Sequence, residues 1–146
     1  MKEEKGNIWD YWIKGHYIVI PVNFFVKRNR EAVMGRGLAL EARNRFPRIP
    51  RRLGEAYLKD GMCVKVFHDN RLFMFPVKHN WWEDASVTLI EESCKQLKIL
   101  VGYFPDMPFP VYVPRVGTGN GKLEWSIVKP ILEKYLDDRF VICGLE

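Results

Sequence analysis

The stretch Val111-Tyr-Val-Pro-Arg-Val-Gly-Thr-Gly-Asn-Gly-Lys-Leu-Glu-Trp-Ser-Ile-Val128 indicates how this chain folds. It reads as a short β-branched strand, a loop with glycine at positions 117, 119 and 121, and an amphipathic helix. Alternate glycines let a ligand approach the backbone and permit the positive φ angles that turn successive N–H groups to one side. Together with a helix N-terminus, such a loop is typical of a phosphate-binding site. A plain tight turn is the alternative, because the spacing matches neither a P-loop nor a dinucleotide-binding turn.

A second unit of the same kind lies earlier in the chain. Tyr17–Val22 is a β-branched run typical of a strand buried on both faces, and it ends at Asn23. A polar residue at the carboxyl end of a central strand is where α/β folds place ligand contacts. Gly35 and Gly37 then open a helix that stops before Pro47. We expect the two glycine loops to converge on one crevice.

The remaining segments predict further strands and helices. Strands are expected at 62–67 and 72–76, joined as a hairpin, at 140–143, and at 6–12, where a turn is the alternative. A short helix is expected at 51–60, and a long helix follows Asp84 or Ser86 as N-cap. Pro130 requires the last helix either to kink or to begin close to Trp125. The residues expected on the inner faces of the last two helices are Val87, Ile90, Cys94, Leu97 and Val101, then Val128, Ile131, Leu132 and Tyr135.

Alternating strands and helices define the fold class. They predict an α/β protein, a three-layer α/β/α sandwich with a mixed, mostly parallel central sheet. A length of 146 residues with 47% hydrophobic residues predicts a single domain over residues 1–146. We expect it to be a monomer.

Composition also narrows the class of protein. No apolar run approaches the roughly 20 residues of a membrane span, and the charged start Met-Lys-Glu-Glu-Lys does not resemble a signal peptide, so no membrane partner is expected. Three cysteines without Cys-x-x-Cys spacing and three isolated histidines argue against a disulfide framework or a metal site. We expect a cytoplasmic protein that needs no metal or cofactor.

The charge balance favours anionic partners. The net charge is +5 and the pI is about 9.2, which suits nucleotides or nucleic acid. Part of the positive charge comes from a run of five arginines, for which a solvated helical face is the alternative interpretation. These are Arg43, Arg45, Arg48, Arg51 and Arg52.

Five motifs in register resemble those of the macro domain family, whose fold binds ADP-ribose. They are Gly6-Asn-Ile, Val22-Asn23, Met34-Gly-Arg-Gly-Leu-Ala39, Phe75-Pro-Val-Lys78 and Pro114-Arg-Val-Gly-Thr-Gly-Asn-Gly-Lys-Leu-Glu-Trp125. The resemblance covers nearly the whole chain. It is strongest to the branch that holds the terminal ADP-ribose glycohydrolases and the antitoxin of a DNA ADP-ribosylating toxin–antitoxin pair.

The resemblance implies roles for particular residues. Asn7 would accept a hydrogen bond from the adenine amino group, with a backbone contact at Ile8, and a turn residue is the alternative for Asn7. Asn23 would bind the distal ribose and take part in catalysis, or else cap the strand end. The glycine loops would contact ribose and wrap the pyrophosphate through Gly35, Arg36, Gly37, Leu38, Gly117, Thr118, Gly119, Asn120 and Gly121.

Lys78 is the residue that the resemblance implicates in cleavage, by attack on the anomeric carbon of the distal ribose. An amine is nucleophilic only when neutral, so desolvation or nearby positive charge must lower its pKa. We expect a partly apolar wall from its neighbours Phe75, Pro76, Val77, Trp81 and Trp82. A lysine that only pairs with a phosphate or a surface acid is the alternative.

One departure bears on the substrate. Glycohydrolases that act on proteins place an aspartate where this chain has Gly121, whereas antitoxin-like members resemble this chain in having glycine there and a tryptophan at the position of Trp125. With the basic charge, this favours ADP-ribosylated DNA, single-stranded and modified on thymidine, over protein. A non-catalytic ADP-ribose reader and an ADP-ribose 1''-phosphate phosphatase are the alternatives.

Overall fold

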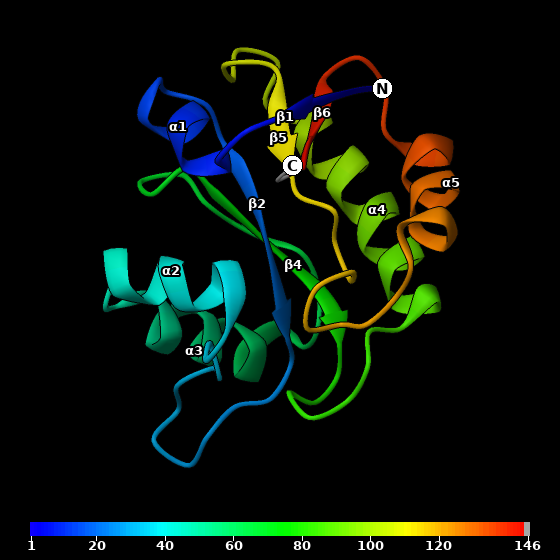
Figure 1. Ribbon diagram of the computed structural model, residues 1–146. Helices are drawn as coiled ribbons and strands as arrows, with labels where there is room; N and C mark the ends of the chain where they lie inside the picture. Colours follow the sequence, from blue (N-terminus) through cyan, green and yellow to red (C-terminus); the bar gives the residue numbers. More distant parts are fainter. Residues whose placement is uncertain (145–146) are drawn as a thin grey trace.

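The computed structural model describes residues 1–144, which form one six-stranded sheet covered by helices (Figure 1). The strand order is β1-β6-β5-β2-β4-β3, and every neighbouring pair is parallel except β3 and β4. The mixed, mostly parallel sheet and the hairpin are therefore confirmed. The strands are β1 (Lys2–Lys5), β2 (Ile18–Asn23), β3 (Lys65–Phe67), β4 (Leu72–Lys78), β5 (Val111–Val113) and β6 (Phe140–Gly144).

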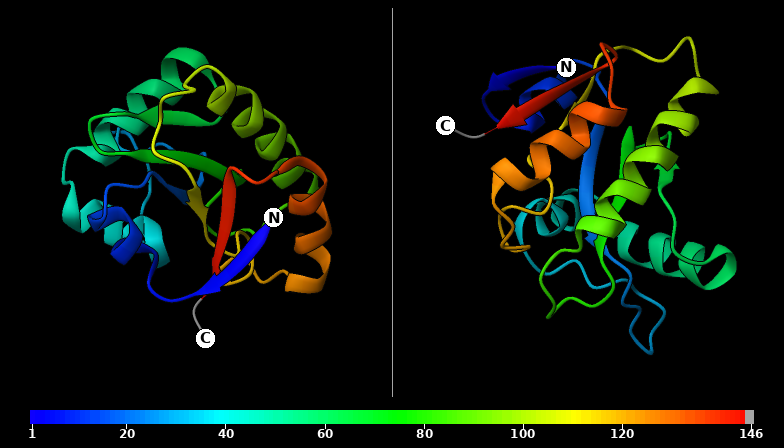
Figure 2. Two further views of the ribbon diagram at one scale, coloured as in Figure 1. Left: turned by 90° about the horizontal axis from the view of Figure 1, so that it is seen from above. Right: turned by 90° about the vertical axis from the view of Figure 1, so that its right-hand side faces the viewer.

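Helices cover both faces of the sheet, as the three-layer prediction requires (Figures 1 and 2). Three helices pack on one face: α1 (Ile8–Ile13), α2 (Gly37–Arg45) and α3 (Ile49–Asp60). The other face is covered by α4 (Val87–Gly102) and α5 (Trp125–Tyr135). Within residues 1–144, each helix is too short or too polar to cross a membrane.

The central strand β2 explains why the core has two halves. Ile18 and Ile20 are fully buried against the α1–α3 layer, and Val19 between them is fully buried against α4 and α5. Because successive side chains of a strand point to opposite faces, a strand covered on both sides must be apolar at every position. The unbroken apolar run that suggested a buried strand has this cause.

The N-terminal segment differs from the prediction. Residues 6–12 were expected to form an edge strand or turn, but α1 begins at Ile8, because the Asn7 side chain accepts a hydrogen bond from the Trp9 N–H at 3.0 Å and caps the helix. The edge strand is instead β1, whose four residues are all charged and exposed. Charged side chains are suited to an edge strand because they discourage further strand pairing.

The structure also decides two alternatives in the second half of the chain. Ser86 is the N-cap of α4, since its hydroxyl accepts from the Leu89 N–H at 3.2 Å. The helix α5 begins at Trp125 and carries Pro130 inside it. Val87, expected to face the sheet, is 40% exposed, because α4 is rotated so that Leu89 lies inward instead.

Candidate functional site

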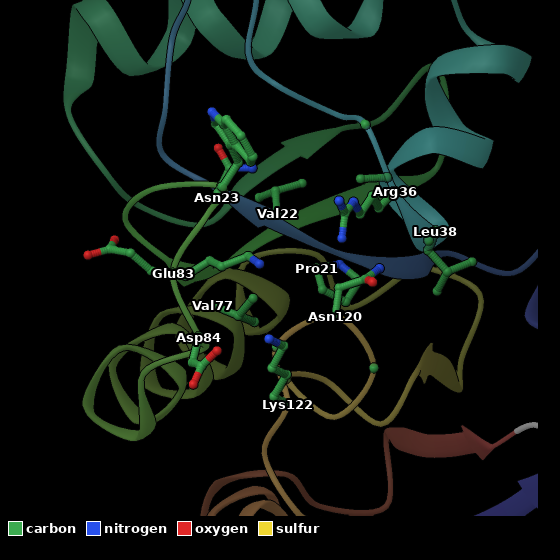
Figure 3. A pocket seen from close by; sticks show the side chains of 18 of the residues that line it. Pro21, Val22, Asn23, Arg36, Leu38, Val77, Glu83, Asp84, Asn120 and Lys122 are labelled. Carbon is green, nitrogen blue, oxygen red and sulfur yellow. The ribbon is translucent and has the colours of Figure 1, made fainter.

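One cavity of about 650 Å³ opens where the carboxyl ends of β2 and β4 meet the two glycine loops (Figure 3). Its position agrees with the general rule that ligands of open α/β sheets bind beyond the carboxyl ends of the strands. Its volume is in the range of small-molecule sites. Ten of the residues expected to bind or act on a ligand line it: Asn23, Gly35, Arg36, Gly37, Leu38, Lys78, Gly117, Gly119, Asn120 and Gly121.

The two glycine loops converge, as expected from their places after β2 and β5. A Cβ atom added to Gly37 would lie 3.3 Å from the Asn120 side-chain nitrogen, so the loops nearly touch across the cavity. Gly37 has φ +57°, a left-handed conformation that favours glycine. Close approach and backbone conformation therefore both explain this glycine.

Both loops that line the cavity carry backbone N–H groups without an acceptor. The N-terminus of α2 has no side-chain cap, and its first residues Gly37, Leu38 and Ala39 line the cavity. Within residues 1–144, the N–H groups of Gly119, Asn120 and Gly121 also have no acceptor. A helix N-terminus opposite successive free N–H groups is an arrangement that binds phosphate oxygens.

The glycines of the second loop have different physical roles. A side chain at Gly117 would meet Ile90 at 2.7 Å, and one at Gly121 would meet the Gly117 carbonyl oxygen at 2.5 Å. Both positions need glycine for the loop to fold over α4. Gly119 is exposed, and a Cβ there would meet nothing within 4 Å, so its bare backbone is left open to a ligand.

Basic side chains outnumber acidic ones around the cavity. Arg36, Lys78, Arg115 and Lys122 line it, against Glu83 and Asp84. Excess positive charge suits a ligand that carries two phosphates. In Figure 3 the Glu83 carboxylate points away from the other labelled side chains, whereas Asp84 lies on the same side of the cavity as Lys122.

Asn23 is held in place by the backbone around it. Its side-chain nitrogen donates to the Val33 carbonyl oxygen at 3.0 Å, and its side-chain oxygen accepts from the Phe25 N–H at 2.9 Å. It is 8% exposed. The strand-end capping that the sequence left open is therefore present, and one N–H of the amide remains for a ligand.

The surroundings of Lys78 shift its pKa in the direction that a nucleophilic amine needs. Burial lowers its pKa, and the positive charges of Arg36 and Lys122 lower it further, against the opposing effect of the carboxylates of Asp84 and Glu83. Within residues 1–144 the amine forms no ion pair within 4.0 Å. The alternative in which it only pairs with a surface acid is therefore not what the structure contains.

Three expected ligand contacts lie outside the cavity lining. The side-chain oxygen of Asn7 caps α1, Ile8 is buried in the core at 4% exposure, and the Thr118 hydroxyl donates to the Arg115 carbonyl oxygen at 2.7 Å. Their contacts with adenine or phosphate stay predictions. The arginine run 43–52 also lies outside this cavity, on α2, α3 and the turn between them. Ion pairs of Arg51 with Glu55 and of Arg52 with Asp69 support its interpretation as a solvated face.

Sequence reasoning foresaw only part of the contribution of the loop between β4 and α4. Trp81, Trp82, Glu83 and Asp84 line the cavity, although only an N-cap or an apolar wall was expected from them. Their position directly after the expected catalytic lysine was the available signal. No group of three potential metal ligands occurs in residues 1–144.

Comparison with known proteins gives relatives in sequence. No protein-family model matches. The chain is 26% identical over 136 residues to a "DNA ADP-ribosyl glycohydrolase" of Thermus aquaticus, an alignment that covers 86% of this chain and 37% of the relative. It is 28% identical over 135 residues to a "DNA ADP-ribosyl transferase-DNA ADP-ribosyl glycohydrolase fusion protein" of Thermosipho africanus, covering 76% of this chain and 34% of the relative. The chain thus spans about a third of the length of the curated relatives it matches.

Solved structures resemble the chain over nearly its whole length. The macrodomain of Mycobacterium tuberculosis DarG superimposes with a TM-score of 0.79 at 21% identity, covering 99% of this chain and 97% of the other. Thermosipho africanus DarTG in complex with ADP-ribose superimposes with a TM-score of 0.76 at 22% identity, covering 99% of this chain and 42% of the other. The chain therefore has the macrodomain fold, as its sequence motifs suggested, and its relatives in sequence include DNA ADP-ribosyl glycohydrolases.

Proposed function

We propose that this chain is an ADP-ribosyl glycohydrolase that removes ADP-ribose from DNA, with thymidine as the modified nucleoside. The observation that carries the proposal is the single cavity in which Lys78, with its lowered pKa, lies at a strand end opposite two sets of free backbone N–H groups. The names of the curated relatives support the same chemistry. The protein would act as a cytoplasmic monomer and, like an antitoxin, reverse the modification made by a DNA-modifying partner enzyme.

Binding of ADP-ribose would use the donors described above. The α2 N-terminus and the N–H groups of 119–121 hold the pyrophosphate, with Arg36 and Lys122 beside them. Asn23 donates its remaining N–H to a hydroxyl of the distal ribose. In this binding mode the anomeric carbon of that ribose would lie near the Lys78 amine.

Cleavage would proceed through Lys78. The neutral amine attacks the anomeric carbon while the bond from that carbon to the base nitrogen breaks and its electron pair stays with the base. The proton lost by the amine after attack goes to the base nitrogen. Water then adds at the same carbon and releases ADP-ribose from the lysine, which returns to its amine form.

A comparison of substrates tests the proposal. ADP-ribosylated single-stranded DNA, ADP-ribosylated protein and ADP-ribose 1''-phosphate are given to the parent and to Lys78→Ala in single-turnover assays. We expect the parent to prefer DNA. Lys78→Ala should bind ADP-ribose within about tenfold, or about 1.4 kcal/mol, of the parent. Its cleavage of DNA should fall by two to three orders of magnitude, about 3–4 kcal/mol in the barrier.

Two further variants separate the amine's chemistry from its charge. Lys78→Arg should also fail to cleave, because a guanidinium stays protonated and is no nucleophile. Lys122→Asn removes a positive charge from the same cavity and suits the φ of +64° at that position. It should weaken ADP-ribose binding. Because Lys122 also lowers the pKa of Lys78, the single-turnover rate at saturation should match that of the parent only at alkaline pH. A parent that binds ADP-ribose but cleaves none of the three substrates would be a reader and not an enzyme.

A further inference from the structure

Two tryptophans at the cavity mouth are exposed where large aromatic side chains are ordinarily covered. Trp81 is 49% and Trp82 58% exposed, whereas Trp9 in the core is 1% exposed. Both line the cavity, and they follow Lys78 by three and four residues in the chain. Exposed indole rings next to a ligand site contribute most to the free energy of binding when a flat, apolar surface of the ligand covers them.

The loop that carries these rings is built to hold them outward. The Asn80 N–H donates to the Glu83 side chain at 2.8 Å, and the Glu83 N–H donates to the Asn80 carbonyl oxygen at 3.1 Å. Trp81 and Trp82 are therefore the two central residues of a closed turn. Their rings meet edge to face at 5.4 Å between centroids, and Trp82 also rests edge to face on Phe25 at 5.5 Å. These contacts leave ring faces open to a partner.

The segment that contacts Trp82 also carries positive charge. Phe25 belongs to the segment after β2, which is joined to the tryptophan loop by the hydrogen bond from the Phe24 N–H to the His79 carbonyl oxygen at 3.0 Å. The turn that follows Phe25 in this segment carries three exposed cations, Lys27, Arg28 and Arg30. Lys27 pairs with Glu31 at 3.6 Å and Arg30 with Glu55 at 3.8 Å, while Arg28 has no ion pair within residues 1–144.

We propose that Trp81 and Trp82, with the cations of 27–30, form a platform for single-stranded DNA on either side of the ADP-ribosylated base. The inference rests on the proposed function, because an ADP-ribose held in the cavity must leave the base it modifies at the mouth. Unpaired bases stack on exposed aromatic rings, and their phosphates need nearby cations. A duplex keeps its base faces covered, and so it cannot use the rings. The platform thus selects a single strand as the substrate.

Kinetics with matched substrates test the platform. The substrates are a single-stranded oligonucleotide carrying one ADP-ribosylated thymidine and the ADP-ribosylated thymidine nucleoside alone. Trp81→Ala with Trp82→Ala should raise KM for the oligonucleotide about five- to a hundredfold, the range for losing one stacked base. KM for the nucleoside and the affinity for free ADP-ribose should change several-fold less than KM for the oligonucleotide, although both rings also line the cavity. Arg28→Glu should act in the same direction on the oligonucleotide only.

Two control variants show whether the effect belongs to stacking at this place. Trp81→Phe with Trp82→Phe keeps flat rings and should recover most of the oligonucleotide affinity. Tyr103→Ala removes an aromatic ring that is 73% exposed at the far end of α4 and should change nothing. An unchanged oligonucleotide KM in the double alanine variant would overturn the platform, as would a loss confined to ADP-ribosylated protein.

Failure of the platform is distinguishable from failure of the proposed function. If the parent cleaves no substrate, the quenching of tryptophan fluorescence can still be used to measure binding of an unmodified single-stranded oligonucleotide. The platform predicts quenching that Arg28→Glu weakens and that a duplex of the same sequence does not produce. Equal quenching by single strand and duplex would reject the platform whatever the activity.

Discussion

Asn23 and Lys78 lie side by side at the carboxyl ends of β2 and β4 because the pairing of these strands skips one residue. Val22 pairs with Pro76, but Asn23 pairs with Lys78, so Val77 is the extra residue of a bulge. Paired residues of neighbouring strands point to the same face, and a regular register would have placed the two side chains on opposite faces. The irregularity therefore brings the amide and the amine to one cavity.

The pH dependence of cleavage should follow the pKa of Lys78. Since only the neutral amine attacks, the single-turnover rate should rise with pH and level off below the range of an ordinary lysine, because burial and neighbouring cations lower this pKa. Asp84 raises the pKa, so Asp84→Asn should move the rising limb to lower pH. Arg36 lowers it, so Arg36→Gln should move the limb to higher pH. Shifts of the same sign in both variants would contradict this electrostatic account.

The charged Lys78 side chain should lower the free energy of unfolding, and a neutral side chain at this position should restore it. Because its pKa is lower in the folded than in the unfolded state, the penalty is fully present below the folded pKa. It is relieved as pH rises through that pKa toward the unfolded value of about 10.4. Lys78→Met should therefore have a higher Tm than the parent at neutral pH, with the gain shrinking at alkaline pH.

A scan of Tm against pH checks this expectation. Lys98→Met, on the exposed side of α4, is the matched control and should stay within about 0.5 kcal/mol of the parent at every pH. A parent that is more stable than Lys78→Met at neutral pH would mean that the charged lysine does not destabilise the fold.

Glycines 119 and 121 should respond differently to substitution. Gly119→Glu has room for its side chain and should fold normally, but it places a negative charge among the free N–H groups and should abolish ADP-ribose binding. Gly121→Ala brings a methyl group against the Gly117 carbonyl oxygen and the Ala85 side chain, and overpacking of this kind costs about 1–3 kcal/mol. Calorimetric titration and thermal unfolding of both variants separate the effects. Normal binding by Gly119→Glu would place the phosphate site elsewhere.

Binding of DNA should be more sensitive to salt than binding of ADP-ribose. An ADP-ribosylated single strand contacts cations outside the cavity through its phosphates and releases counterions, with a slope of about −0.7 per phosphate contact in a log–log plot. Free ADP-ribose contacts the cavity alone and should give the shallower slope. Titrations of a non-cleaving Lys78→Ala variant from low to moderate salt provide both slopes. Equal slopes would argue against nucleic acid as the substrate.

The sequence by itself determined the layers of the fold and the two glycine loops. Tyr17–Val22 predicted the buried strand β2 because a strand covered on both faces needs an apolar residue at every position. The glycines at 35, 37 and 119 predicted backbone open to an anion because no other residue leaves it bare, whereas those at 117 and 121 are needed for the packing of the loop. Such features depend on near neighbours in the chain and can be recognised from one sequence.

Only the tertiary structure decided which side chains share the cavity. The bulge that aligns Asn23 with Lys78 arises from pairing between strands about 50 residues apart and leaves no local pattern. The charged strand β1 is a strand only because β6 offers it an edge, and Asn7 caps a helix that its aromatic neighbours did not suggest. Trp81 and Trp82 read as an apolar wall, and only the packing of their closed turn against Phe25 leaves them exposed. Contacts between distant segments, which no local propensity encodes, set all of these outcomes except the local cap at Asn7.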